Sequence, residues 1–228
     1  IDKELQEIAE GALSAVFREA SPRRGDIVFL DPKSGEILAA ASREVTPDGG
    51  VAASASYFLN SFEPGSTAKP FTAAALLQLK RVDSLTAVSG ENGRWKMPTA
   101  GRRTREIEDE HPAQGPITLA RAIQVSSNIG MAKFGSKLRP EEHYDFLRGF
   151  GFGSPSGVDF AAEGAGILPA LPHRWRQGDQ APSVAMGYAF QVTPIQLAAA
   201  YGALANDGLL LAPAVVKEVR RKDGTVLY

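Results

Sequence analysis

The sequence of 228 residues contains no cysteine, which excludes disulfide bonds, thiolate metal sites and cysteine nucleophiles. It also lacks any apolar run long enough to span a bilayer. Neither sign of charge is in excess, because 25 Lys and Arg stand against 26 Asp and Glu. We therefore expect no nucleic-acid partner.

Histidine is scarce, with His111, His143 and His173 as the three examples, and we expect each of them on the surface or in a loop. Gly-x-Ser-x-Gly is absent as well, so a Ser-His-Asp hydrolase is disfavoured. No spacing typical of metal ligands occurs, and no cofactor is implied.

Charged residues crowd one stretch, 102–110, in which three arginines meet four acidic residues. We interpret this stretch as a solvated mixed-charge loop rather than a binding patch. Its members are Arg102, Arg103, Arg105, Glu106, Glu108, Asp109 and Glu110.

Periodicity and turn residues predict an α+β fold. Helical patterns are expected at about residues 2–18, 66–79, 119–125, 128–138, 141–149 and 193–206. Strands are expected at 26–31, 36–41, 214–220 and 225–228, the first two and the last two joined as hairpins by Gly-containing turns. Thr193, Pro194 and Gln196 predict a capping box for the last helix.

This order of elements predicts an antiparallel sheet that is interrupted by a large helical subdomain. We expect residues 1–228 to form a single, partial domain. Its expected parts are an N-terminal helix with the first strands (1–61), a helical subdomain (62–208) and returning strands (209–228).

Ser66 and Lys69 form a Ser-x-x-Lys pattern at an expected helix start, where one turn of helix places both on the same face. A serine hydroxyl needs a nearby base, and burial together with the helix dipole favours a neutral Lys69 amine. The Ser66 amide could serve as one oxyanion donor. Alternatively, Gly65-Ser66-Thr67 is an ordinary helix cap, and composition alone gives roughly one such tetrad in a chain of this size.

Ser126 and Asn128 form a Ser-x-Asn pattern between two helical stretches. In an extended backbone they would face a common cleft while Ser127 turned away. The Ser126 hydroxyl could then relay a proton to a leaving amine, and the Asn128 carboxamide could hold a substrate amide. Helix capping is the alternative interpretation.

Together these segments resemble the transpeptidase domain of class B penicillin-binding proteins, in the order that the family shows. Phe-Glu-Pro-Gly-Ser-Thr-Ala-Lys-Pro-Phe-Thr at 62–72 is similar to its active-serine signature, and Val-Ser-Ser-Asn-Ile-Gly-Met-Ala at 125–132 is similar to its second motif. Segments 31–38, 149–153 and 187–197 match further blocks, the last most like the septal, division-type enzymes.

The resemblance implies a penicillin-binding and serine β-lactamase-like fold. It implies a peptidoglycan D,D-transpeptidase that cross-links stem peptides during cell-wall synthesis and cell division. β-Lactams would acylate such an enzyme. Ser66 would be the acylated nucleophile, Lys69 its base, Ser126 a proton shuttle and Asn128 a hydrogen-bond partner of the acyl donor. The parent protein is expected on the outer face of the cytoplasmic membrane, or in the periplasm, with a membrane anchor and with division or cell-wall synthesis proteins as partners.

The family's third motif, Lys-Thr/Ser-Gly, does not follow Asn128. Lys33-Ser34-Gly35 precedes Ser66 in a turn, and Lys222-Asp223-Gly224 has Asp where a hydroxyl is needed. We therefore expect a C-terminally truncated domain that folds but is catalytically impaired. Its unpaired sheet edge near 214–228 is expected to invite pairing with another chain.

Two alternatives stay open from the sequence. One is a β-lactam-binding sensor or non-catalytic scaffold domain, which keeps the fold and binds without turnover. The other is a D,D-carboxypeptidase or serine β-lactamase, which shares the first two motifs and deacylates by water.

Overall fold

The computed structural model describes residues 1–99, 103–170, 175 and 180–227, and these form two compact units. The sheet unit comprises Ile1–Phe62, Phe150–Ile167 and Val192–Tyr228, and the helical unit comprises Glu63–Gly149 and Leu168–Gln191. The stretch 62–208, expected as one subdomain, is thus divided between the units, since 150–167 and 192–208 belong to the sheet unit.

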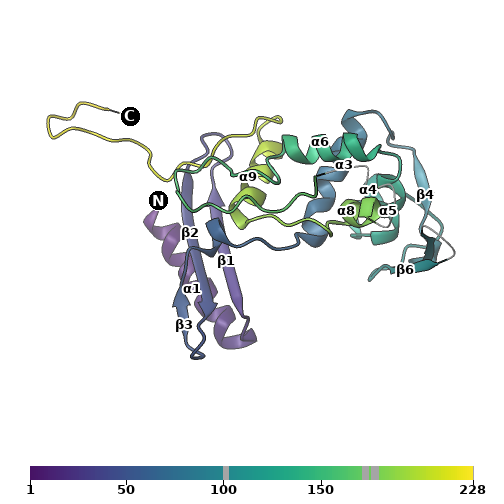
Figure 1. Ribbon diagram of the computed structural model, residues 1–228, viewed down its shortest axis with the longest axis horizontal. Coiled ribbons are helices and arrows are strands. Elements are labelled where there is room, and N and C mark those ends of the chain that lie inside the picture. The colour runs from purple at the N-terminus through teal and green to yellow at the C-terminus, as the bar shows by residue number, and fades with distance from the viewer. Residues whose placement is uncertain (100–102, 171–174, 176–179, 228) are drawn as a thin grey trace. The chain divides into compact units, whose positions relative to one another are not determined.

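Helix α1 (Lys3–Ala20) opens the sheet unit, as its apolar spacing predicts. The Asp2 side chain caps it by accepting a hydrogen bond of 3.0 Å from the Leu5 amide. The helix lies against strand β2 (Figure 1) and buries Ala9 and Leu13. Ile8 of the same helix is 60% exposed and so lies off this packed face.

Strands β1 (Arg24–Leu30) and β2 (Ile37–Val45) form the predicted antiparallel hairpin. Their turn is fixed by Asp31, whose carboxylate accepts from the Lys33 amide at 2.8 Å. A third strand, β3 (Val51–Ala53), was not predicted and pairs with the end of β2. The sheet order β1-β2-β3 leaves β1 as an edge strand within the described part of the chain.

Besides α1, helices α2 and α9 pack on this sheet and form a second buried cluster. The short helix α2 (Ser56–Leu59) and helix α9 (Pro194–Ala205) contribute Phe58 and Ile195 to a buried cluster with Ile37 of β2. The capping box predicted for α9 is confirmed: the Thr193 hydroxyl accepts from the Gln196 amide, and the Gln196 side chain accepts from the Thr193 amide.

The strands expected at 214–220 and 225–228 are not formed in the described residues after α9 (yellow in Figure 1). Ala214 makes a single bridge to Glu36, and Arg220 makes one to Val226 around the expected Asp-Gly turn. Three valines of this segment, Val215, Val216 and Val219, are 43–46% exposed, so it finds no buried face that would stabilise a strand. In the described residues the edge strands of this sheet are therefore β1 and β3, and no edge strand is formed near 214–228.

The described part of the helical unit contains the four helices predicted there, a further helix (α8) that was not predicted, and four strands that were not predicted. The helices are the 3₁₀ turn η1 (Gly65–Ala68), α3 (Lys69–Gln78), α4 (Leu119–Gln124), α5 (Asn128–Gly135), α6 (Pro140–Gly149) and α8 (Gln180–Met186). The strands form two antiparallel pairs, β4 (Ala87–Ser89) with β7 (Pro116–Thr118) and β5 (Arg94–Pro98) with β6 (Thr104–Glu108).

The core of the helical unit centres on α3 and α5. Leu76 of α3 and Met131 and Phe134 of α5 are completely buried in one cluster. Helix α5 also packs closely on α8. Gly135 allows this approach, since a Cβ atom there would collide with the Ala185 side chain. Among the described residues, no helix is both long and apolar enough to cross a membrane.

Candidate active site

Lys69, the first residue of α3, lies at the centre of the candidate site in the helical unit. Lys69 is buried, with only 2% of the residue exposed. The Nζ atom donates to the Ser126 carbonyl oxygen at 2.6 Å, to the Ser126 hydroxyl at 3.1 Å and to Asn128 Oδ1 at 2.8 Å. The structure therefore brings three of the four sequence-predicted site residues into direct contact.

The protonation of Lys69 is shifted in the direction that the sequence predicts. Burial lowers the pKa of the Lys69 amine to about 8, and the nearby Asp109 carboxylate opposes this shift. The lowered pKa increases the fraction of neutral amine, which is the form that can accept a proton.

Ser66 lies in the 3₁₀ turn η1, one turn before Lys69, and is exposed. Its hydroxyl makes no hydrogen bond to any described residue, so its contact with Lys69 is not formed in this structure. The α-helix begins at Lys69 rather than at Ser66, because the preceding residues adopt the tighter 3₁₀ geometry.

The loop that presents Ser66 is held by a distant glycine. The Gly65 amide donates to the Gly187 carbonyl oxygen at 2.9 Å, and the Ala189 amide donates to Glu63 Oε1 at 2.9 Å. Gly187 has φ +96°, and a Cβ atom there would overlap the Gly65 carbonyl oxygen. Only glycine fits this close backbone approach.

The turn that carries Ser126 and Asn128 differs from the predicted extended segment. Ser126 has φ +56°, in the left-handed region, and Asn128 is the first residue of α5. Their oxygen atoms nevertheless converge, because the left-handed residue reverses the chain between α4 and α5 around Lys69. Capping, the alternative interpretation, is carried out by Ser127, whose hydroxyl accepts from the Gly130 amide at 2.8 Å.

Asp109 is the polar residue of this site that the sequence analysis missed. It is 7% exposed, and its carboxylate accepts from the Ser127 hydroxyl at 2.5 Å and from the Asn128 amide at 2.6 Å. The expected mixed-charge loop is therefore wrong here: residues 104–108 form strand β6, and Arg102 lies outside the described residues. Burial alternates along this strand and its next residue, so Asp109 shares the inner face with Ile107. Ile107 is the one apolar residue of 104–109, so the sequence carried little sign of this alternation.

His143 also departs from expectation, because it lies inside α6 and is 2% exposed. Its Nε2 atom is 3.0 Å from the Thr72 hydroxyl, and its ring meets Trp175 edge to face. Burial lowers the pKa of the His143 imidazole to about 4. His111 is exposed in a loop as expected, and His173 lies outside the described residues.

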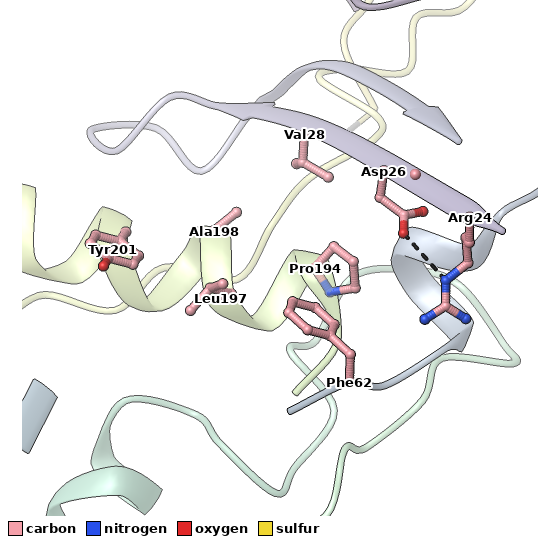
Figure 2. Close-up of a pocket in the computed structure, with 9 residues that line it drawn as sticks. Arg24, Asp26, Val28, Phe62, Pro194, Leu197, Ala198 and Tyr201 are labelled. Atoms are coloured by element: carbon pink, nitrogen blue, oxygen red, sulfur yellow. Dashed lines mark ion pairs between the residues drawn. The ribbon is translucent and has the colours of Figure 1, made fainter. Parts of the chain in front are cut away.

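A cavity of about 510 Å³ lies in the sheet unit, between β1 and α9 (Figure 2). Its walls are mostly apolar, and its charged lining residues are Arg24 and Asp26, whose Nε and Oδ2 atoms are 3.7 Å apart. It contains none of the candidate site residues. Among the described residues, no three His, Cys, Asp or Glu side chains gather as a metal site would require.

Exposed Ser66 lies one turn before buried Lys69, and the Ser126–Asn128 turn holds the Lys69 amine. This arrangement is typical of the active-serine, penicillin-recognising class of domains. The family model described as the penicillin binding protein transpeptidase domain matches residues 25–226. This chain belongs to that family.

Similar proteins agree with this assignment. The chain is 32% identical over 224 residues to a Pseudomonas aeruginosa protein named probable peptidoglycan D,D-transpeptidase PbpC, covering 96% of this chain and 38% of the relative. It is 32% identical to stage V sporulation protein D of Bacillus subtilis, covering 96% and 34%. The chain thus spans about a third of the length of these curated relatives.

Solved structures support the same fold. The transpeptidase domain of Burkholderia pseudomallei penicillin-binding protein 3 matches with a TM-score of 0.82 at 30% identity, over 99% of this chain and 62% of that one. Penicillin-binding protein 3 of Mycobacterium tuberculosis in complex with aztreonam matches with a TM-score of 0.84 at 26% identity, over 99% and 50%. The predicted family and its mixed helix and sheet fold are confirmed.

Proposed function

We propose that this chain is the acyl-serine domain of a peptidoglycan D,D-transpeptidase that cross-links stem peptides during cell-wall synthesis. The observation that carries the proposal is the buried Lys69 amine, held by Ser126 and Asn128 one turn after the exposed Ser66. The family assignment and the names of the relatives support the same reaction class.

In the proposed first step, the Ser66 oxygen attacks the carbonyl carbon of the D-Ala-D-Ala peptide bond while the neutral Lys69 amine takes the hydroxyl proton. The Ser66 amide, at the start of the 3₁₀ turn, donates to the developing oxyanion. As the tetrahedral intermediate collapses, the C–N bond breaks and D-alanine leaves. Ser126 contacts the Lys69 amine and passes the proton to the leaving nitrogen.

In the second step, an amine from a neighbouring stem peptide attacks the Ser66 ester. The new amide bond forms, the ester bond breaks, and the proton lost by the amine returns through Lys69 and Ser126 to the Ser66 oxygen. Asn128 accepts from Lys69 with Oδ1 and donates from Nδ2 to the Glu108 carbonyl oxygen at 3.1 Å. We assign its amide to binding the acyl donor, which would exchange one of these two bonds for a bond to the substrate.

β-Lactams would enter the same pathway and remain as esters of Ser66. Solved structures of the M. tuberculosis relative are complexes with aztreonam and with ampicillin, so a protein of this fold binds such compounds. We further propose that the parent protein works on the outer face of the cytoplasmic membrane, anchored there and associated with division or cell-wall synthesis proteins.

A second candidate function is β-lactam binding without turnover, as in a sensor or scaffold domain. The observation that favours it is the Ser66 hydroxyl, which makes no hydrogen bond to the Lys69 amine in this structure. A strained β-lactam ring needs less activation of the serine than a peptide bond does, so such a site would favour β-lactam binding over transpeptidation.

The test is to incubate the purified chain with a fluorescent penicillin and to measure its intact mass. The proposal expects a single adduct on the wild type and none on Ser66→Ala, while Ser84→Ala, which removes an exposed hydroxyl in the same unit, labels normally. An adduct on Ser66→Ala would show that another residue is the nucleophile. Labelling that is not followed by transfer of a stem peptide to an acceptor amine would favour the second candidate.

The acylation rate should also depend on pH in a defined direction. Because the neutral form of Lys69 is the base and its pKa is about 8, the rate is expected to rise as the pH passes from 7 to 9 and then to level off. Lys69→Arg keeps a permanent positive charge and should lose labelling at every pH in that range. A wild-type rate that stays flat between pH 7 and 9 would contradict the role of Lys69 as base.

A further inference from the structure

We infer that Asp109, at the end of the β5–β6 hairpin, is a positioning residue of the acyl-transfer site that holds the Ser126–Asn128 turn and supplies the negative charge opposite Lys69. The inference rests on the proposed function, because it assigns a role to a side chain outside both sequence motifs. It extends the site from two loops of the helical unit to a third element.

The geometry places Asp109 at the start of α5. Its Oδ1 atom accepts from the amides of Asn128 and Ile129, at 2.6 and 3.0 Å, and its Oδ2 atom accepts from the Ser127 hydroxyl at 2.5 Å. Three donors from three consecutive residues therefore converge on one buried carboxylate. A carboxylate at a helix N-terminus is favoured by the free amides and by the helix dipole.

The backbone of the hairpin also binds this turn, because the Glu108 carbonyl oxygen accepts from Asn128 Nδ2 at 3.1 Å. The Asp109 amide closes the base of the hairpin by donating to the Gly93 carbonyl oxygen at 3.0 Å. Asn128 is consequently held on two sides by consecutive residues of the hairpin. Its Oδ1 atom is thereby left to face the Lys69 amine.

The second part of the argument is electrostatic. The groups that contact the Lys69 amine from the α4–α5 turn, Ser126 and Asn128, are neutral. Asp109, beyond that turn, is the described charged group that acts on Lys69, and it favours the protonated amine against burial. From α6, the buried His143 contacts Thr72 rather than Lys69.

Asp109→Asn separates charge from geometry, because an amide oxygen can still accept from both backbone amides. The chain offers a matched control in Asp83, an exposed residue of the same unit whose Oδ1 atom accepts from two backbone amides and from the Thr86 hydroxyl. Two readouts are needed: the penicillin labelling rate against pH, and the titration of the Lys69 side-chain resonance in protein with ¹³C-labelled lysine, identified by its absence in Lys69→Arg.

We expect Asp109→Asn to lower the pH midpoint of both readouts by about one unit, since an opposite charge at this range shifts a pKa by about one to three units. Asp83→Asn should leave both midpoints unchanged. Asp109→Ala removes the acceptor as well, and we expect at least a tenfold loss of labelling at every pH. An unchanged Lys69 midpoint in folded Asp109→Asn would overturn the inference.

The readouts also separate this inference from the proposed function. If the wild type fails to label while Asp109→Asn still moves the Lys69 resonance, the proposed function fails and the coupling of Asp109 to Lys69 stands. If Asp109→Asn does not fold, Ser127→Ala carries the test because it keeps the charge. It should slow labelling about threefold with the Lys69 midpoint unmoved, and a shift of a full unit in this variant would overturn the inference.

Discussion

Helices α5 and α9 both begin with a hydroxyl cap, but they obtain their remaining partners from different distances along the chain. At α9, Thr193 and Gln196 satisfy each other within four residues. At α5, the Ser127 cap is supplemented by a carboxylate from 18 residues earlier. The first arrangement can be read from adjacent letters of the sequence, whereas the second depends on a hairpin folding back onto the helix.

The difference matters because the distant partner belongs to the candidate active site. A local capping box fixes where a helix begins, and little else. A carboxylate delivered by another element also fixes how that helix start faces its surroundings, and it brings a charge. We expect the α5 start to be the more sensitive of the two to substitution in function, and the following variants test how far the contrast extends to stability.

The largest expected effect is a loss of stability at the start of α9, where Gln196 also has partners outside its capping box. Gln196 is 2% exposed, and its Nε2 atom donates to the carbonyl oxygens of Ser154 and Ala165 at 2.5 and 2.8 Å. Gln196→Ala would leave these groups and the Thr193 amide without partners, and we expect it to lower the free energy of unfolding by about 4 kcal/mol. Urea denaturation measures this loss, with Gln78→Ala, at an exposed helical glutamine, as control.

If Gln196→Ala cost less than about 1 kcal/mol, the distant bonds of Gln196 would be energetically unimportant. The α9 start would then be local in energy as well as in sequence.

Acidification is the next test, and it acts on His143, a buried residue of the helical unit that is hydrogen-bonded to the distant Thr72. The pKa of His143 falls from its ordinary value of 6.5 to about 4 in the folded chain. Below pH 6.5 His143 is protonated in the unfolded chain but stays neutral in the folded chain. The free energy of unfolding therefore decreases as the pH is lowered from 6.5 to about 4. The expected loss is about 3 kcal/mol over that window.

Urea denaturation at pH 7, 5 and 4 measures the loss, and His143→Gln should remove most of it. Hydrogen bonds from Arg139 and Arg81 hold the pKa of the Glu142 carboxyl at about 2, so its own contribution to stability starts to fall below pH 4.5. That loss affects the pH 4 point of both chains alike and cancels in the difference between the wild type and His143→Gln. Equal slopes for the wild type and His143→Gln would show that His143 is accessible to solvent in the folded chain.

Much of the fold could be predicted from the sequence because its signals are local. The β1–β2 hairpin follows from its turn, and α9 follows from its capping box. The strands expected at 214–220 and 225–228 failed, since apolar letters predict a strand only where a partner surface exists to bury them. Strand β6 was missed for the opposite reason, as its charged outer face concealed the buried positions Ile107 and Asp109.

The candidate site divides in the same way. Ser66, Lys69, Ser126 and Asn128 were identified from short patterns and from the family resemblance, and the structure joins the last three around one amine. The left-handed Ser126 could not be predicted, because an extended and a reversed backbone both bring positions 126 and 128 together. The roles of these residues stay predictions until labelling is measured.

The smallest expected effect is the direct comparison of the two caps. Ser127→Ala removes the acceptor for the Gly130 amide and also a donor to Asp109, so two buried groups lose a partner, and we expect about 2 kcal/mol of destabilisation. Thr193→Ala leaves one amide, that of Gln196, without its acceptor, and we expect about 1 kcal/mol. Urea denaturation of the two variants in parallel gives the difference. The penicillin labelling rate gives a second contrast, because Ser127→Ala disturbs the turn around Lys69, whereas Thr193 belongs to the sheet unit. Equal losses of stability with unchanged labelling in both variants would mean that the Asp109 bond adds nothing to the Ser127 cap, and the contrast between α5 and α9 would then be one of sequence distance alone.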